Sequence, residues 1–211
     1  MTRPTLSHET AQRALNAARD YLSAANVALK HRLESASLDQ EQRAAHGFAW
    51  AATSVSAMEA LLDWAAAGGG QNPVDQMVVE LGFAETLAQL VGGLPMGQNE
   101  IFRPADLGLQ AEAKLLAEAA APYLEGNFAP IRAQLAAALA DGQWPSETLH
   151  DSDLDAIREQ YRRFTDAAIV PHAHSWHLAN ALIPDETVAA MAELGTFGVC
   201  IGEDYGGLGL G

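Results

Sequence analysis

Three stretches in the first hundred residues place apolar side chains every three or four positions, which is the spacing of one face of an α-helix. The first stretch, residues 7–33, opens with Ser7, a residue type that caps helices well. The repeating apolar residues of the three stretches are Leu15, Ala18, Leu22, Ala25, Leu29 and Leu33; Phe48, Ala51, Val55, Met58, Leu62 and Ala65; and Val74, Met77, Leu81, Ala84, Ala88 and Val91. Because each face is too narrow to be buried on all sides, the sequence predicts helices packed as a bundle.

Glycine and proline mark the ends of these helices. Residues 68–70 are three glycines that predict the end of the second helix, which is expected to follow the first at once. Asn72 and Pro73 favour the start of the third helix, and Gly92 with Gly93 favours its end. From Gly92 to residue 109 the helical spacing fails, so we expect an ordered loop that Ile101 and Phe102 attach to the bundle.

Helices are again predicted over residues 110–121 and 127–140. Residues 142–146, which read Gly-Gln-Trp-Pro-Ser, interrupt the helical pattern. We therefore expect a helical block over residues 1–145 and a second piece over residues 146–211. Alanine and leucine are abundant and runs of β-branched residues are scarce, so the fold class is expected to be all-α.

The second piece begins with one helix and ends in a glycine-rich turn. A short helix is expected to start at Pro184 and to end at Gly195. Glycines 206, 207 and 209 can adopt backbone angles closed to other residues, so this turn can lie close to another domain or a ligand. The first helix, which should stop or kink at Pro171, has an apolar face made of Leu154, Ile157, Tyr161, Phe164 and Ala168.

Charge and composition exclude several functions. Twelve Lys and Arg face 27 Asp and Glu, which gives a net charge of -15 and argues against nucleic acid or an anionic membrane as the main partner. No signal peptide and no run of eighteen apolar residues, the length that crosses a membrane, is present. One cysteine, Cys200, excludes an internal disulfide and fits a reducing compartment. We expect a cytoplasmic protein.

The residues capable of chemistry have plainer interpretations. His172, His174 and His177 could bind zinc, but two of them point about 200° apart on a helix and no cysteine or carboxylate completes a compact site. We expect surface histidines beside Trp176. Cys200 follows an apolar run and has no cationic neighbour in sequence, which predicts a buried, inert thiol. The four tryptophans, expected to fill a core or an interface, are Trp50, Trp64, Trp144 and Trp176.

Several short motifs of the second piece occur in an order that resembles the amino-terminal helical domain of acyl-CoA dehydrogenases. The matching residues are Arg163-Phe164, Pro171, Trp176, Ile183-Pro184, Glu193-Leu194-Gly195, Phe197-Gly198 and Glu203-Asp204-Tyr205-Gly206-Gly207-Leu208-Gly209. The resemblance implies that residues 146–211 are the first, incomplete part of this domain. Gly211 would then leave a loop open where a further helix should begin, so we expect the front part of a longer enzyme.

The resemblance also implies the chemistry of the complete protein. Acyl-CoA dehydrogenases bind FAD, remove an α proton from an acyl-CoA with a glutamate, pass a hydride to the flavin and reduce an electron-transfer flavoprotein. A homo-oligomer is implied as well. No residue here matches that glutamate, so we assign no catalytic, cofactor-binding or metal-binding residue. This portion alone is expected to be inactive without the remainder of the enzyme.

Two glycine motifs resemble cofactor-binding sequences, but neither is assigned a role in cofactor binding. Residues 206–209 are no dinucleotide fingerprint, because no βαβ unit surrounds them. Residues 89–93 resemble the Gln-x-x-Gly-Gly segment that helps to hold the FAD of a neighbouring subunit in this family. That segment belongs to the carboxyl-terminal domain of the family, however, so its role is not carried over to residues 89–93.

The first block indicates which members of the family the chain resembles most, and one alternative function remains. Methylsuccinyl-CoA dehydrogenases carry a helical extension ahead of the family's domain, and residues 97–109 look similar to part of it. This similarity implies (2S)-methylsuccinyl-CoA as substrate, in the ethylmalonyl-CoA pathway. The alternative is a helical adaptor that docks on an enzyme without catalysis, which the acidic surface and apolar stripes also allow.

Overall fold

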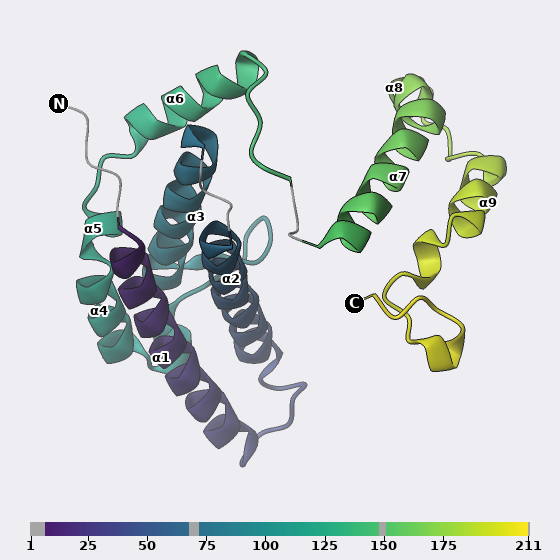
Figure 1. Cartoon of the computed structure of the whole chain (residues 1–211). Helices are drawn as coiled ribbons and strands as arrows, with labels where there is room; N and C mark the ends of the chain where they lie inside the picture. The colour runs from purple at the N-terminus through teal and green to yellow at the C-terminus, as the bar shows by residue number, and fades with distance from the viewer. Residues whose placement is uncertain (1–6, 68–71, 148–150, 211) are drawn as a thin grey trace. The chain divides into compact units, whose positions relative to one another are not determined.

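The computed structural model describes residues 7–67, 72–147 and 151–210, and nearly all of its regular structure is helical (Figure 1). The chain divides into two compact units, Met1–Thr148 and Leu149–Gly211. The expected all-α fold is confirmed. The glycines at 68–70 and Gly211, which carried two of the predictions, lie outside the described residues.

Three long helices form the centre of the first unit: α1 (His8–Leu33), α2 (Gln42–Ala66) and α3 (Pro73–Gly92). Ser7 caps α1 by accepting a hydrogen bond from the Thr10 N–H at 3.2 Å. Asn72 caps α3 in the same way through Asp75 N–H at 2.9 Å. Helix α1 packs against α2, and α2 packs against α3. The predicted bundle is confirmed, but turns at residues 34–41 separate the first two helices.

The buried face of α3 differs from the predicted one. Ala88, expected in the apolar stripe, is exposed, whereas Phe83 and Leu87 are fully buried. The reason is that α3 contacts α2 on one side and later helices on another, so its buried surface is wider than a single stripe. Tyr21 of α1 is also buried in this core, with its ring 2% exposed.

The loop between the third and fourth helices is a small hairpin that is anchored by one ring. Strand β1 (Leu94–Pro95) pairs antiparallel with β2 (Ile101–Phe102), and a 3-10 turn, η1 (Pro104–Leu107), follows. Phe102 is buried so tightly against Gly47 of α2 that a Cβ at position 47 would lie 2.1 Å from Cδ2 of the ring. Ile101 is 37% exposed, because neighbouring strand residues face opposite sides. The predicted attachment is confirmed: Phe102 attaches through its buried ring, and Ile101 through its carbonyl oxygen, which accepts a hydrogen bond from Arg43 of α2 at 2.7 Å.

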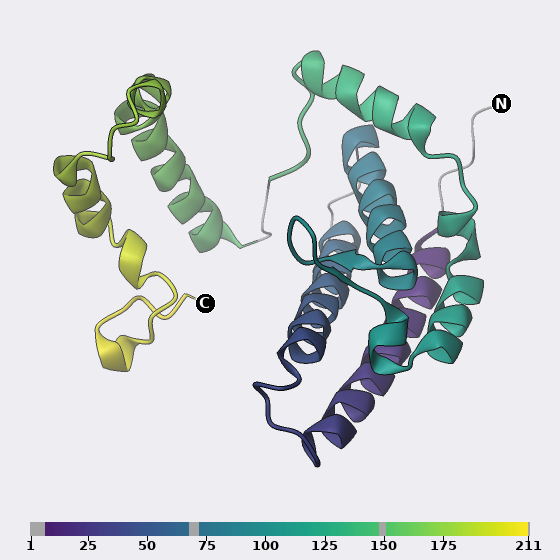
Figure 2. The same ribbon diagram turned by 180° about the vertical axis from the view of Figure 1, so that it is seen from behind.

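Three further helices close the first unit: α4 (Gln110–Ala119), α5 (Ala121–Leu124) and α6 (Ala129–Ala140). Helix α4 packs on α1 and α3, while α5 and α6 pack on α3. Seen from behind in Figure 2, α6 crosses the end of α3. It buries no residue completely, and Ile131 and Leu135 are the side chains with which it contacts the core.

The segment after α6 is attached to α3 by a buried carboxylate. Asp75 of α3 is fully buried, and it accepts hydrogen bonds from the Ser146 N–H at 2.7 Å and the Ser146 hydroxyl at 2.6 Å. The side-chain amide of Asn72 donates to the same hydroxyl oxygen at 3.2 Å. Ser146 is therefore held at the amino-terminal end of α3. The domain limits 1–145 and 146–211 stay a prediction.

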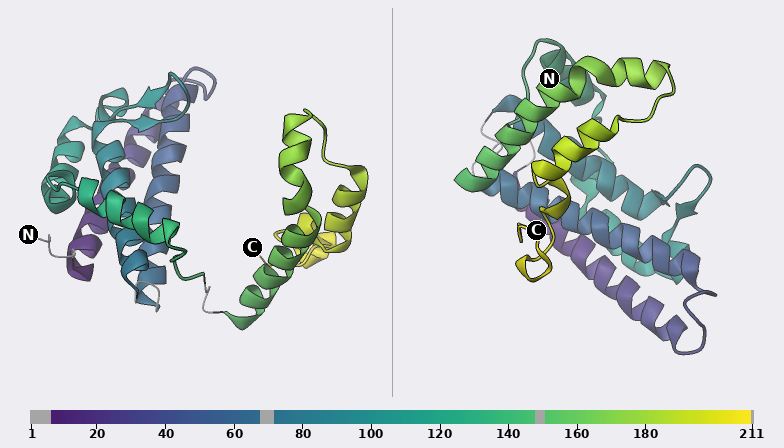
Figure 3. Two further views of the ribbon diagram at one scale, coloured as in Figure 1. Left: turned by 90° about the horizontal axis from the view of Figure 1, so that it is seen from above. Right: turned by 90° about the vertical axis from the view of Figure 1, so that its right-hand side faces the viewer.

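The second unit consists of α7 (Ser152–Ala168), α8 (Val170–Leu178) and α9 (Asp185–Glu193), followed by 3-10 turns η2 (Thr196–Gly198) and η3 (Glu203–Tyr205). The helix breaks at Ile169, two residues before Pro171, as predicted; Figure 3 shows the resulting bend between α7 and α8. Gly195 follows α9 with φ of 84° and ends the helix, also as predicted. None of the described residues in this unit is buried.

Membrane insertion of a helix finds no support in this fold. Within the described ranges, no helix combines the length and the apolar character that crossing a bilayer requires.

Candidate functional site

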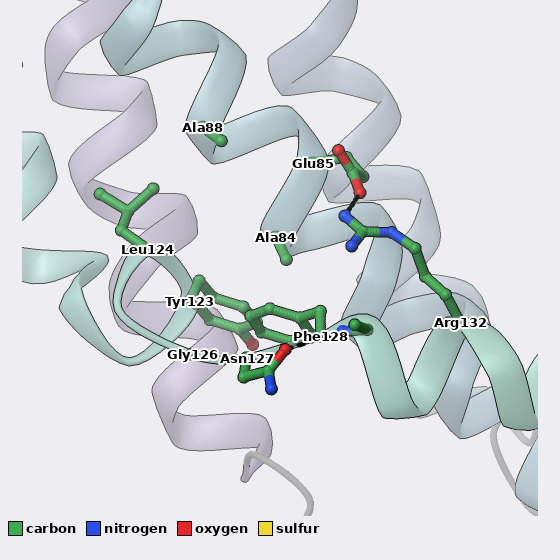
Figure 4. Close-up of a pocket in the computed structure, with 10 residues that line it drawn as sticks. Ala84, Glu85, Ala88, Tyr123, Leu124, Gly126, Asn127, Phe128 and Arg132 are labelled. Carbon is green, nitrogen blue, oxygen red and sulfur yellow. Dashed lines mark hydrogen bonds and ion pairs between the residues drawn. The ribbon is translucent and has the colours of Figure 1, made fainter.

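A hollow of about 270 Å³ lies on the first unit between α3, α5 and α6 (Figure 4). Its lining includes Tyr123 and Phe128, which are both buried, and the charged side chains of Glu85 and Arg132. The Tyr123 ring also packs on Phe83 in the core, with ring centroids 5.6 Å apart. The hollow is thus a surface depression whose aromatic floor belongs to the bundle core.

The polar groups of this hollow are engaged with one another. Figure 4 shows Arg132 of α6 reaching Glu85 of α3, with which it forms an ion pair. The Asn127 side-chain oxygen accepts a hydrogen bond from the Ala129 N–H at 3.1 Å and so caps α6. The arrangement therefore holds α6 against α3.

Elsewhere in the described part of the first unit, Tyr21 and Asp106 have shifted pKa values, and both shifts have structural causes. Burial raises the pKa of Tyr21 to about 12, with the charges of Glu112 and Asp106 contributing. Desolvation would raise the pKa of Asp106, but the hydrogen bond from the Arg103 N–H and the Arg43 guanidinium outweigh it and lower the pKa. Arg43 lies 3.2 Å from the Asp106 carboxylate and 2.7 Å from the Ile101 carbonyl oxygen, so this pair anchors the hairpin.

The histidines of α8 lie on the surface. His172, His174 and His177 are all exposed, and the rings of His172 and Trp176 are tilted by 30° with their centroids 5.6 Å apart. This confirms the prediction of surface histidines beside Trp176. In the part of the chain that the structure describes, no group of three or more His, Cys, Asp or Glu is placed to hold a metal ion.

The burial predicted for Cys200 is wrong, and of the two places expected for the tryptophans, a core or an interface, the core is contradicted while the interface stays a prediction. Cys200 is exposed, because the apolar run that contains it folds into short turns in a unit without a buried core. Trp50 and Trp144 are 41% and 67% exposed, and Trp64 and Trp176 are only partly buried, so no tryptophan fills the core. Trp50 instead donates its indole N–H to His46, one helical turn earlier, at 2.8 Å.

The glycine turn at the end of the second unit packs against its own chain. Gly206 and Gly209 have φ of 79° and 64°, angles that favour glycine. Gly209 N–H donates to the Ile201 carbonyl oxygen at 2.8 Å, and a Cβ at Gly207 would lie 2.0 Å from the same oxygen. The close approach expected for this turn is therefore made to residues 198–202.

The glycines at the end of α3 also serve the fold. Gly93 N–H donates to the Gln89 carbonyl oxygen at 2.8 Å and ends the helix. A Cβ at Gly93 would lie 2.7 Å from Cγ2 of Ile101, so glycine lets the hairpin close over this position. Asp75, which sequence reasoning missed, gives no local signal of its partner because Ser146 lies so far along the chain.

Comparison with known proteins relates both units to one family. The family model "Acyl-CoA dehydrogenase, N-terminal domain" matches residues 151–211. The (2S)-methylsuccinyl-CoA dehydrogenase of Cereibacter sphaeroides is 37% identical over 199 residues, which cover 88% of this chain and 36% of that protein. The glutaryl-CoA dehydrogenase of Desulfococcus multivorans is 40% identical over 58 residues, which cover 28% of this chain and 15% of that protein.

The chain thus spans about a third of the length of the longer-matching relative and a smaller share of the other. The match to the first relative extends well beyond residues 151–211 and so includes much of the first unit. The resemblance predicted from the order of short motifs is confirmed. Residues 151–211 thus match the amino-terminal domain of acyl-CoA dehydrogenases, and the chain as a whole is similar to the amino-terminal part of one member of that family.

Proposed function

We propose that this chain is the amino-terminal portion of an FAD-dependent acyl-CoA dehydrogenase that acts on (2S)-methylsuccinyl-CoA by α,β-dehydrogenation. The supporting observation is the identity of 37% that extends over 88% of the chain. The glutaryl-CoA dehydrogenase, in contrast, matches only 58 residues. The first unit is therefore the region that favours the methylsuccinyl-CoA enzyme over other members of the family.

The proposal assigns different roles to the two parts of the chain. Residues 1–145 are the helical extension, and residues 146–211 are the first part of the family's amino-terminal domain. The buried contacts of the first unit support an extension that holds its own shape. The exposed apolar side chains of the second unit support a segment that packs against the remainder of the same enzyme.

The catalytic groups of the complete enzyme are proposed to lie outside this portion. FAD would accept the hydride that leaves the substrate, and an electron-transfer flavoprotein would reoxidise it. Several described carboxylates are held by other groups of the fold: Glu41, Glu59 and Glu85 pair with arginines, and Asp75 is bound by Ser146. We infer that this portion alone does not turn over substrate, and that the complete protein is a cytoplasmic homo-oligomer.

The decisive experiment isolates the natural polypeptide that contains these residues. We expect intact mass well above 22.3 kDa, flavin absorbance, and faster reduction of an artificial electron acceptor with (2S)-methylsuccinyl-CoA than with glutaryl-CoA. Faster turnover of glutaryl-CoA would overturn the proposed substrate. A colourless protein without turnover of either compound would overturn the enzyme and favour the helical adaptor.

A further inference from the structure

A second hollow, of about 370 Å³, lies on the first unit beside the end of α3, the η1 turn and one face of α4. Its wall is mainly apolar, with Val91, Pro104 and Ala113 among the lining residues. Two cationic residues, Arg103 and Lys114, also line it. An apolar depression with two positive charges at its edge is an unusual combination on a chain of net charge -15.

These two cations differ from several others in the described part of the chain. Arginines in the described part of the chain commonly pair with a carboxylate, as in Arg19–Glu59, Arg32–Glu41, Arg43–Asp106, Arg132–Glu85 and Arg158–Asp155. Within the same described residues, neither Arg103 nor Lys114 forms an ion pair. The Asp106 carboxylate nearest to Arg103 in sequence is bound by Arg43 at 3.2 Å and by the Arg103 backbone N–H at 2.7 Å.

Both cations are attached to backbone that is held in place. Arg103 precedes the buried Pro104, and its Cγ would lie 3.4 Å from a Cβ at Gly93, so the stem of the side chain follows the end of α3. Lys114 follows the buried Ala113 on α4, a helix that packs on both α1 and α3. The separation of the two backbones is thus fixed by the core, while the charged ends remain accessible.

The partial negative charge at the carboxyl-terminal end of α3 offsets only part of the positive charge of Arg103 and Lys114. Helix α3 has no basic residue in its last turn, so nearby cations interact favourably with its carboxyl-terminal end. That end carries the equivalent of about half a negative charge. Two full positive charges exceed this half charge, and part of the Arg103 charge also acts on the Asp106 carboxylate.

We propose that this hollow binds a small carboxylate anion with a short hydrocarbon part. The guanidinium of Arg103 and the ammonium of Lys114 would contact the carboxylate, and the apolar wall would cover the hydrocarbon. A large polyanion is disfavoured by the net charge of -15 on the whole chain. Because the cations are exposed, binding is expected in the millimolar range. This inference does not depend on the proposed enzymatic function.

The test is an NMR titration of the whole chain with sodium butyrate at constant ionic strength. We expect saturable amide shifts grouped at Arg103, Gln110 and Lys114. Butyramide, which has nearly the same shape without the charge, should shift them at least about fivefold less at equal concentration. The R103Q/K114Q variant should lose the saturable response, and K114Q alone should weaken it at least threefold.

The matched control is R13Q/K30Q, which removes the same charge from two exposed residues of α1. It should keep the butyrate response within a factor of two. If the control lost the butyrate response as fully as R103Q/K114Q does, the response would be a general charge effect and the proposed site would be overturned. Equal shifts with butyramide and butyrate would also overturn it. So would the absence of any saturable shift with butyrate. If R103Q/K114Q does not fold, K114Q decides, because Lys114 is exposed and its replacement leaves the core intact.

Discussion

The two units use similar helical patterns and reach different degrees of burial. In the first unit, α1 through α4 bury a continuous apolar cluster that includes Leu15, Met58 and Phe83. In the second, the expected apolar face of α7 is only half-buried along its length, and Leu182 and Tyr205 are 91% and 88% exposed. A periodic apolar face therefore predicts a helix but leaves open whether the same unit covers that face.

The largest expected difference between the units is in hydrogen exchange of the whole chain. Amides of α1, α2 and α3 should be protected at least roughly a hundredfold more than those of α7 and α9, because opening the first unit exposes a buried core. Mass spectrometry of peptides after exchange would measure this. Equal protection in both units would contradict the comparison and show that the second unit is stabilised by contacts other than burial.

A matched pair of phenylalanine substitutions sharpens the comparison. Phe83→Ala removes a ring that is 0% exposed and should lower the free energy of unfolding by about 3–5 kcal/mol. Phe197→Ala removes a ring that is 58% exposed and should change it by less than about 1 kcal/mol. Urea unfolding followed by circular dichroism measures both. A similar loss in the two variants would refute the difference in burial.

A smaller effect is expected at the buried carboxylate. Asp75→Asn keeps the shape of the side chain but leaves a Ser146 donor without an acceptor, which should cost about 1–3 kcal/mol. Asp185→Asn, at the exposed start of α9, is the control and should cost less than about 1 kcal/mol. Proteolysis should also cleave residues 141–147 faster in Asp75→Asn. Unchanged cleavage would mean that Asp75 does not hold this segment.

The smallest effect concerns pH. The lowered pKa of Asp106 in the folded state means that its ionised form stabilises the first unit above the ordinary pKa of aspartate. This contribution is lost as the pH falls through the folded-state pKa. Asp106→Asn should therefore lower the urea midpoint slightly at pH 7 and leave it unchanged at acid pH below that pKa. An equal change at both pH values would exclude ionisation of Asp106 as the cause.

Much of the fold follows from local sequence. The caps at Ser7 and Asn72 and the break before Pro171 depend on neighbouring residues, and each is confirmed. The hairpin is missed because strands of two residues leave no alternating pattern. The predicted burial of Cys200 is wrong. Burial depends on which other residues cover the apolar run that contains Cys200, and the sequence of the run does not encode those residues.

The candidate sites are less predictable. The Glu85–Arg132 pair joins residues of α3 and α6 that no spacing relates, and so does the Asp75–Ser146 contact. The hollow beside Arg103 and Lys114 depends on how the hairpin turns the chain back toward α4. Such sites are products of tertiary packing, whereas the family resemblance depends on motif order and is visible without a structure.

The packing of α1 against α4 has a consequence for synthesis. Helix α1 ends at Leu33, and its partner α4 begins only at Gln110. At roughly 5–20 residues per second, the apolar face of α1 waits several seconds on the ribosome before α4 exists to cover it. We expect protease resistance of α1 in stalled nascent chains to appear only after α4 has emerged, which makes this interval the time when a chaperone would be needed.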